Sequence, residues 1–192
     1  MQIEYEATFY PVKKDEIRRK LIEVGAKLKK TEYVQKRYVF HMPSGHEIFG
    51  GWVRVRDEGD KVTMSLKVVD GVNIENQKEI CLRVDNFDVA VSLLESLGCK
   101  RKAYQETRRE MWQVDDVEVC IDEWPWLEPF VEIEGVFEQA VKKVSELIGF
   151  DYKQAKFCSV DTLFAEKYGI ANDVFNNQTE LIVFDGINPF VK

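Results

Sequence analysis

Strict alternation of polar and apolar residues marks the start of the chain. Between Ile3 and Phe9, the polar residues Glu4, Glu6 and Thr8 alternate with apolar ones. Because successive side chains of a β-strand point to opposite faces, these three share one face of a predicted strand. Two carboxylates on one face repel each other unless water or a cation lies between them. Mg²⁺ binds such oxygen ligands, often with substrate phosphates, although a strand with a solvated face shows the same pattern.

Helical and alternating patterns of apolar residues divide the rest of the chain into predicted elements. Helical spacing of apolar residues predicts helices at residues 13–26, 86–98, 137–148 and 159–168. Alternating or β-rich segments predict strands at residues 27–41, 52–57, 61–69, 74–84, 101–114, 117–124 and 130–136. The connections between strands are short, which favours antiparallel pairing, so we expect an α+β domain whose helices cover the apolar sheet faces.

The last part of the chain has a different character. Residues 1–168 form one predicted domain, and residues 169–192 form a tail. Within the tail, residues 181–184 predict a short strand, and Asp185-Gly186 predicts a turn. Phe184 and Phe190 indicate that the tail docks on the domain or on a partner, and a lid over one end of the domain is a further alternative.

Composition narrows the classes of function. The chain of 192 residues has a net charge of −7, which argues against a general nucleic-acid binder. We find no apolar run long enough to span a bilayer, and we expect a cytoplasmic protein. The four cysteines are widely spaced and predict neither a zinc knuckle nor a redox pair. His41 and His46 are too isolated for a histidine-based metal site.

Charge is sorted by strand on the polar faces. One face of residues 52–57 carries Arg54 and Arg56, and one face of residues 130–136 carries Glu132 and Glu134. A solvated surface usually mixes the two signs. A closed antiparallel barrel can instead enclose a polar interior. Facing acidic and basic walls suit a polyphosphate with its divalent metal, because arginine and lysine bind phosphate oxygens and carboxylates hold the cation.

Six short motifs carry these residues, in the order Glu4-Tyr5-Glu6, Val53-Arg54-Val55-Arg56, Ser65-Leu66-Lys67, Lys78-Glu79, Glu118-Val119-Cys120-Ile121-Asp122 and Phe130-Val131-Glu132-Ile133-Glu134. In this order the chain resembles the CYTH superfamily, also called triphosphate tunnel metalloenzymes. That superfamily includes class IV adenylyl cyclases, thiamine triphosphatases and inorganic triphosphatases. The resemblance extends over about residues 1–168.

The resemblance implies an eight-stranded antiparallel β-barrel, a tunnel with helices packed on its outside. It implies that Mg²⁺ or Mn²⁺ is the cofactor, with catalytic and metal-binding carboxylates at Glu4, Glu6, Glu132 and Glu134. It implies that the triphosphate is bound by Arg54, Arg56, Lys67 and Arg109. Arg37 shares a strand face with His41 and is either a further triphosphate-binding cation or a solvated surface residue. The further tunnel-lining residues are Thr8, Glu79, Thr107 and Asp122. The implied partner is a nucleoside triphosphate or another triphosphate compound, with no nucleic acid and no membrane, and a homodimer stays open.

Two positions depart from the family pattern. The first-strand lysine of the family is replaced by Thr8, and a Lys-x-Arg pattern reads Thr107-Arg108-Arg109. A threonine hydroxyl still donates to phosphate but lacks the charge, and a charge-assisted contact is worth about 1.5–3 kcal/mol. Three functions therefore stay open: an adenylyl cyclase, a triphosphate phosphohydrolase, and a non-catalytic nucleotide or polyphosphate sensor. Trp52 and the loop at residues 124–129 offer stacking surface for a substrate ring, although tryptophan is more often a packing residue.

Overall fold

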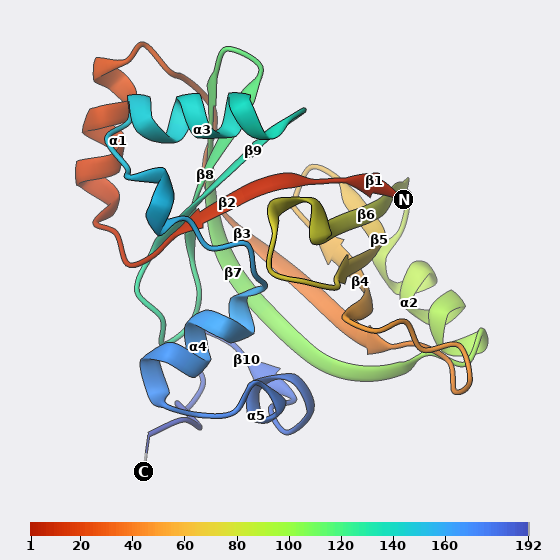
Figure 1. Cartoon of the computed structure of the whole chain (residues 1–192). Helices are drawn as coiled ribbons and strands as arrows, with labels where there is room; N and C mark the ends of the chain where they lie inside the picture. The colour runs from red at the N-terminus through yellow and green to blue at the C-terminus, as the bar shows by residue number, and fades with distance from the viewer. Residues whose placement is uncertain (192) are drawn as a thin grey trace.

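A β-sheet that closes on itself forms the centre of the computed structural model, which describes residues 1–191 (Figure 1). Its strands are β1 (Gln2–Ile3), β2 (Tyr5–Phe9), β3 (Lys27–His41), β4 (Gly51–Asp57), β5 (Val62–Val69), β6 (Gln77–Val84), β7 (Lys100–Val114), β8 (Val117–Glu123), β9 (Phe130–Gly135) and β10 (Leu181–Ile182). The order around the sheet is β1-β6-β5-β4-β3-β7-β8-β9-β2, and these neighbours pair antiparallel.

The first strand closes the barrel by pairing on both sides. Its β1 part pairs with β6, and its β2 part pairs with β9. The two parts are separated at Glu4, whose backbone N–H still donates to the carbonyl of Gln77 at 2.9 Å. Counted as one interrupted strand, β1 and β2 complete a wall of eight strands with β3 to β9 in the described residues. The predicted eight-stranded antiparallel barrel is therefore confirmed.

Two groups of helices cover the outside of the barrel (Figure 1). Helices α1 (Lys14–Glu23) and α3 (Glu138–Leu147) bury Leu21 and Val141 against the outward side chains of β2, β8 and β9, such as Ala7 and Ile133. Helix α2 (Phe87–Ser96) packs on the opposite side over β4 and β5. Apolar strand faces thus point outward to helices, which leaves the polar faces for the interior.

The C-terminal part packs on a third side. Helices α4 (Val160–Tyr168) and α5 (Asn172–Asn177) lie beneath the barrel in Figure 1, and β10 pairs parallel with β7. Phe164, Phe175 and Ile182 form an apolar cluster with Trp124, to which Phe190 is also packed. The tail therefore lies against the loop that follows β8.

Two local elements of the structure differ from those that the sequence predicts. Residues 74–76 form a 3₁₀ turn rather than the start of a strand, because the side chain and backbone of Asn76 bond with Asn73 and the buried Ile74 turns into the apolar core. Helix α5 was not predicted from its asparagine-rich sequence. It forms because Phe175 is buried and because Asn172 and Asn176 both donate to Asp161.

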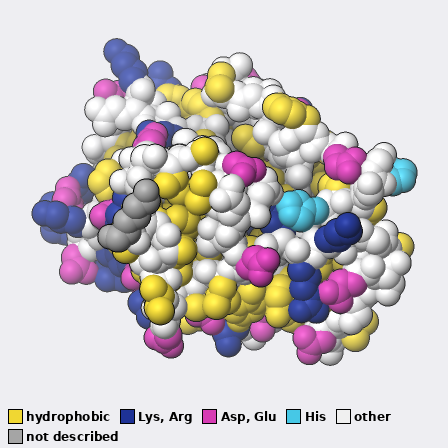
Figure 2. All heavy atoms as spheres, turned by 90° about the horizontal axis from the view of Figure 1, so that it is seen from below, with side chains coloured by type: hydrophobic (Ala, Val, Ile, Leu, Met, Phe, Trp, Pro, Cys, Tyr) yellow, Lys and Arg dark blue, Asp and Glu magenta, His cyan; other side chains and the backbone are white. Residues whose placement is uncertain are grey.

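The outer surface differs from the interior in how charge is distributed. Figure 2 shows the face seen from below, where basic and acidic side chains are interspersed with apolar ones. Inside the barrel, carboxylates and guanidinium groups gather on different strands. Among the helices formed by residues 1–191, none has the length and apolar character needed to cross a membrane.

Candidate active site

A cavity of about 210 Å³ lies inside the barrel. Eleven residues that the sequence singled out line it: Glu4, Glu6, Arg37, Arg54, Arg56, Lys67, Glu79, Arg109, Asp122, Glu132 and Glu134. Thr8 and Thr107 are buried beside these residues instead of lining the cavity, with Thr8 opposite Glu132 in the sheet. The structure thus brings together residues from all parts of the barrel wall.

Strand register builds an acidic wall on one side of the cavity. Glu6 of β2 lies opposite Glu134 of β9, and Glu134 lies opposite Glu118 of β8. Burial raises the pKa of Glu6 well above its usual range, and the nearby Glu132 raises it further. Burial likewise raises the pKa of Glu134. Carboxylates that lie this close on neighbouring strands raise one another's pKa values.

Lys67 links this acidic wall to the next strands. Its Nζ forms an ion pair with Glu4 Oε2 at 2.8 Å. This buried oxygen has no hydrogen-bond partner among residues 1–191. Burial raises the pKa of Glu4 more than Lys67 lowers it. The neighbouring Glu79 accepts from Arg54 at 3.1 Å. Burial would raise the pKa of Glu79, but Glu4, Arg54 and Lys67 together hold it below its usual value.

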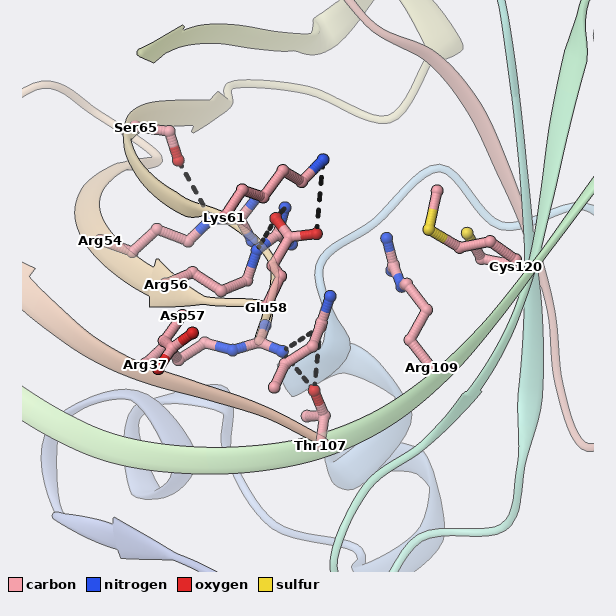
Figure 3. Close-up of polar contacts among 12 residues, drawn as sticks. Arg37, Arg54, Arg56, Asp57, Glu58, Lys61, Ser65, Thr107, Arg109 and Cys120 are labelled. Carbon is pink, nitrogen blue, oxygen red and sulfur yellow. Dashed lines mark hydrogen bonds and ion pairs between the residues drawn. The ribbon is translucent and has the colours of Figure 1, made fainter. Parts of the chain in front are cut away.

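A cluster of guanidinium groups faces the acidic wall. Figure 3 shows Arg37 of β3 beside Arg54 and Arg56 of β4, with Arg109 reaching in from β7. Arg37 and Arg56 are directly paired in the sheet. Arg109 donates to both oxygens of the buried Asp122, at 2.8 and 2.6 Å. Although burial opposes the charge, this bidentate pair keeps the pKa of Arg109 well above its usual value.

Arg37 is the least compensated of these four cations. Its side chain is 6% exposed, and its Nε has no hydrogen-bond partner among the described residues. One terminal nitrogen donates to Gln35 Oε1 at 3.0 Å and to the Thr107 hydroxyl, and the guanidinium lies 4.9 Å from the ring centre of Trp124. Burial lowers the pKa of Arg37 well below its usual value, and repulsion from Arg56, Arg54 and Arg109 lowers it further.

The donor set suits a hard divalent cation, but its side chains are not gathered around one point. Within residues 1–191, no group of three or more His, Cys, Asp or Glu side chains is arranged to hold a metal ion. The chemistry of the donors nevertheless fits, because the buried Glu4 Oε2 lacks a hydrogen bond and the carboxylate of Glu6 is destabilised by its neighbours. Glu4, Glu6, Glu132 and Glu134 are the residues that would hold a metal.

Several lining residues were missed in the sequence. Glu58 lies one step of the two-residue alternation beyond Arg56, and Gln105 and Glu118 lie two steps from Arg109 and Asp122, so extending each alternation would have found them. Lys61 follows the hairpin turn and lies on the same two-residue alternation as Ser65 and Lys67. The last group comes from the C-terminal part and includes Asp161, Phe175 and Asn176, which only the three-dimensional fold brings to the cavity. Trp52 and Trp124 both line the cavity.

Comparison with known proteins identifies a protein family, in agreement with the barrel and its charged interior. Residues 2–163 match the CYTH domain, and the chain therefore belongs to the CYTH family. Members of this family typically process triphosphate compounds with a divalent metal. The match ends within α4, so the rest of α4, α5 and the tail lie outside it. A comparison with curated protein sequences finds no match.

Solved structures share the fold at low sequence identity. A protein of Pyrococcus horikoshii OT3 is 22% identical with a TM-score of 0.68, covering 83% of this chain and 98% of its own. A candidate adenylate cyclase from Vibrio parahaemolyticus is 12% identical with a TM-score of 0.72, covering 85% and 98%. A candidate adenylyl cyclase from Hippeastrum with a dominant triphosphatase activity is 12% identical with a TM-score of 0.56, covering 89% and 97%. At these identities the likeness establishes the fold alone.

Proposed function

We propose that this protein binds a triphosphate compound inside the barrel together with Mg²⁺ or Mn²⁺ and processes its phosphate chain. The observation that carries the proposal is the set of four guanidinium groups around one cavity, of which Arg37 is buried with an unpartnered Nε. A buried cation repelled by three others is costly without a counterion. Arg54, Arg56 and Arg109 each have a carboxylate partner, whereas Arg37 has no ion pair among residues 1–191, and an anion with several charges at this place would compensate it.

The residues divide into two roles in this proposal. Arg37, Arg54, Arg56, Lys67 and Arg109 are the cations available to phosphate oxygens, and contacts with several of them fix the chain in one orientation. The carboxylates of Glu4, Glu6, Glu132 and Glu134 hold the divalent metal, which when bound neutralises charge on the phosphate oxygens and the leaving group. The closed barrel wall excludes bulk water from these contacts, which strengthens each of them.

The nature of the nucleophile separates two enzymatic outcomes. If the ribose 3′-hydroxyl of a nucleoside triphosphate attacks, the products are a cyclic nucleotide and pyrophosphate. If water held by a carboxylate attacks, the product is a shortened phosphate chain. Among the similar structures, one is described as a candidate adenylyl cyclase with a dominant triphosphatase activity, which supports testing both.

The second candidate function is a non-catalytic sensor of a nucleotide or polyphosphate. Thr107 favours it, because its hydroxyl accepts from Arg37 and donates to Gln35 Oε1 at 3.1 Å and is therefore engaged within the protein. Thr8 also favours it, since it supplies no charge where the family has lysine. The clustered carboxylates argue against it, because an anion binder gains nothing from them.

Assays of the purified protein with ATP, tripolyphosphate and thiamine triphosphate, each with Mg²⁺ and Mn²⁺, test the proposal. We expect metal-dependent turnover that Glu4→Gln and Glu134→Gln abolish. Glu146→Gln is the matched control, because Glu146 lies exposed on α3. Absence of turnover by the wild type, with calorimetry showing metal-independent binding, would instead establish the sensor. Absence of both turnover and binding would reject the proposal.

A further inference from the structure

Glu58 stands out among the cavity residues because it is an acid within the basic half. It lies in the hairpin between β4 and β5, a place where side chains are usually exposed, yet it is only 3% exposed and lines the cavity. The alternation that turns Arg54 and Arg56 inward continues to Glu58. The inference drawn here rests on the proposed triphosphate-binding function.

The Glu58 carboxylate binds the cations around it in the way a phosphate group would. Arg56 approaches Oε1 with two nitrogens, at 2.8 and 3.0 Å. On the other oxygen, Lys61 Nζ lies at 3.5 Å (Figure 3). The Tyr33 hydroxyl donates to the same oxygen at 3.4 Å. Within residues 1–191, Glu58 is the ion-pair partner of both Arg56 and Lys61. The carboxylate therefore neutralises these two cations before any ligand arrives.

The backbone of the hairpin fixes this carboxylate in place. The N–H of Glu58 donates to the carbonyl of Lys61 at 2.9 Å, and Lys30 Nζ donates to the carbonyl of Glu58 at 2.8 Å. Burial raises the pKa of Glu58, but Arg56 and Lys61 lower it by more, so that the group stays ionised near neutral pH. A ligand thus meets a permanent anion tethered at this end of the cavity.

We propose that Glu58 is a specificity-determining residue. Its carboxylate occupies the Arg56 and Lys61 end of the cavity and keeps substrate phosphate away from these two cations. Phosphate groups are then bound by Arg37, Arg54, Lys67 and Arg109, and they reach Arg56 only by displacing Glu58. The tethered carboxylate limits how much negative charge the cavity accepts. It selects a ligand whose phosphates are confined to one end, and it weakens the binding of bare polyphosphate chains.

Calorimetric titration of Glu58→Gln with tripolyphosphate tests this. Glutamine keeps the shape and one acceptor oxygen but removes the competing charge. Because a charge-assisted hydrogen bond is worth about 1.5–3 kcal/mol, we expect the dissociation constant to fall about tenfold or more. Asp60→Asn is the matched control, since Asp60 lies in the same hairpin with a side chain 64% exposed, and it should bind like the wild type.

Arg56→Gln provides a second test that does not require Glu58→Gln to fold. If Glu58 occupies Arg56, the substitution Arg56→Gln in the wild-type background changes tripolyphosphate affinity by less than about threefold. The same substitution in a Glu58→Gln background should cost about tenfold, because Arg56 then contacts phosphate. A tenfold loss in the wild-type background would overturn the inference.

The outcomes also separate this inference from the proposed function. If the wild type binds tripolyphosphate and Glu58→Gln binds it equally or more weakly, the inference is wrong and the proposed function stands. If neither protein binds tripolyphosphate, with or without Mg²⁺, the proposed function is wrong and the inference falls with it. Thermal melting of each variant establishes that the proteins compared are folded.

Discussion

Replacing Arg37 with methionine should keep or raise the free energy of unfolding while it weakens ligand binding. The guanidinium is buried among three other cations, and one of its nitrogens has no hydrogen-bond partner in the described residues. Methionine has a similar length and no charge. It removes the repulsion within the cluster, and Gln35 and Thr107 remain bonded to each other at 3.1 Å, so no new buried polar group is left unpaired.

The magnitude follows from two opposing effects. Even a buried ion pair, whose charges compensate each other, can be replaced by apolar side chains of similar volume with a gain of about 1–4 kcal/mol, and Arg37 has no such partner to lose. Against this, Arg37→Met loses hydrogen bonds to Gln35 and Thr107, each worth about 1 kcal/mol. We therefore expect the free energy of unfolding to stay level or rise. For a chain of this size, each kcal/mol corresponds to about 2–4 °C in Tm.

Ligand binding should change in the opposite direction. Loss of one charge-assisted phosphate contact, at about 1.5–3 kcal/mol, weakens tripolyphosphate binding by about tenfold or more. Differential scanning fluorimetry with and without tripolyphosphate measures both quantities in one experiment. Lys36→Met is the control, since Lys36 is exposed on the same strand. A variant that melts well below the wild type, or one that binds tripolyphosphate as tightly, would refute the reasoning.

Three further predictions follow from packing and burial. Asp122→Asn replaces the bidentate carboxylate partner of Arg109, which keeps its ion pair with Glu132, and should cost about 1.5–3 kcal/mol in urea unfolding. With a thiol reagent at pH 8, the exposed Cys81 should react first, whereas burial raises the pKa of Cys158 to about 12 and keeps it a protonated, slow thiol. Truncation after Tyr168 removes the apolar cover of the loop after β8 and should lower Tm by several degrees through lost apolar burial.

Each of these has its own control and contrary outcome. Asp115→Asn, in an exposed turn, should leave urea unfolding unchanged, and equal midpoints for both variants would contradict the role of the Asp122 pair. The Cys81→Ser variant should lose the fast thiol phase, and its persistence would assign that phase to another cysteine. A truncated protein with unchanged Tm, activity and oligomeric state would show that the tail contributes nothing to the barrel.

Much of the barrel could be predicted because its strands obey a simple rule. Val53 and Val55 point outward to α2, whereas Arg54 and Arg56 point inward, as the alternation requires. The same rule, with the resemblance to a known family, led to eleven charged residues that line the cavity. The alternation was not extended to Glu58, because a residue in a hairpin is normally solvated. Its burial depends on its contacts with the neighbouring cations.

Other features could not be read from local sequence. Helix α5 depends on Asp161 accepting from Asn172 and Asn176, a contact between separate segments. Which cations are compensated also depends on register: Arg109 lies opposite Asp122, whereas Arg37 lies opposite Arg56. Sequence patterns place a side chain on a face, but pairing across strands decides whether its charge is satisfied.

The closing strand has a consequence for how the protein is made. Residues of β2 meet β9, near the opposite end of the barrel sequence, so Glu6 and Glu134 are brought together by one of the longest-range pairings in the chain. Pairings between distant segments form slowly during folding. During synthesis the N-terminal strand has to wait, unpaired on that side, until β9 has left the ribosome. We therefore expect the carboxylate wall to be among the last parts of the molecule to assemble, and chains stalled before β9 to expose an apolar strand face that invites aggregation.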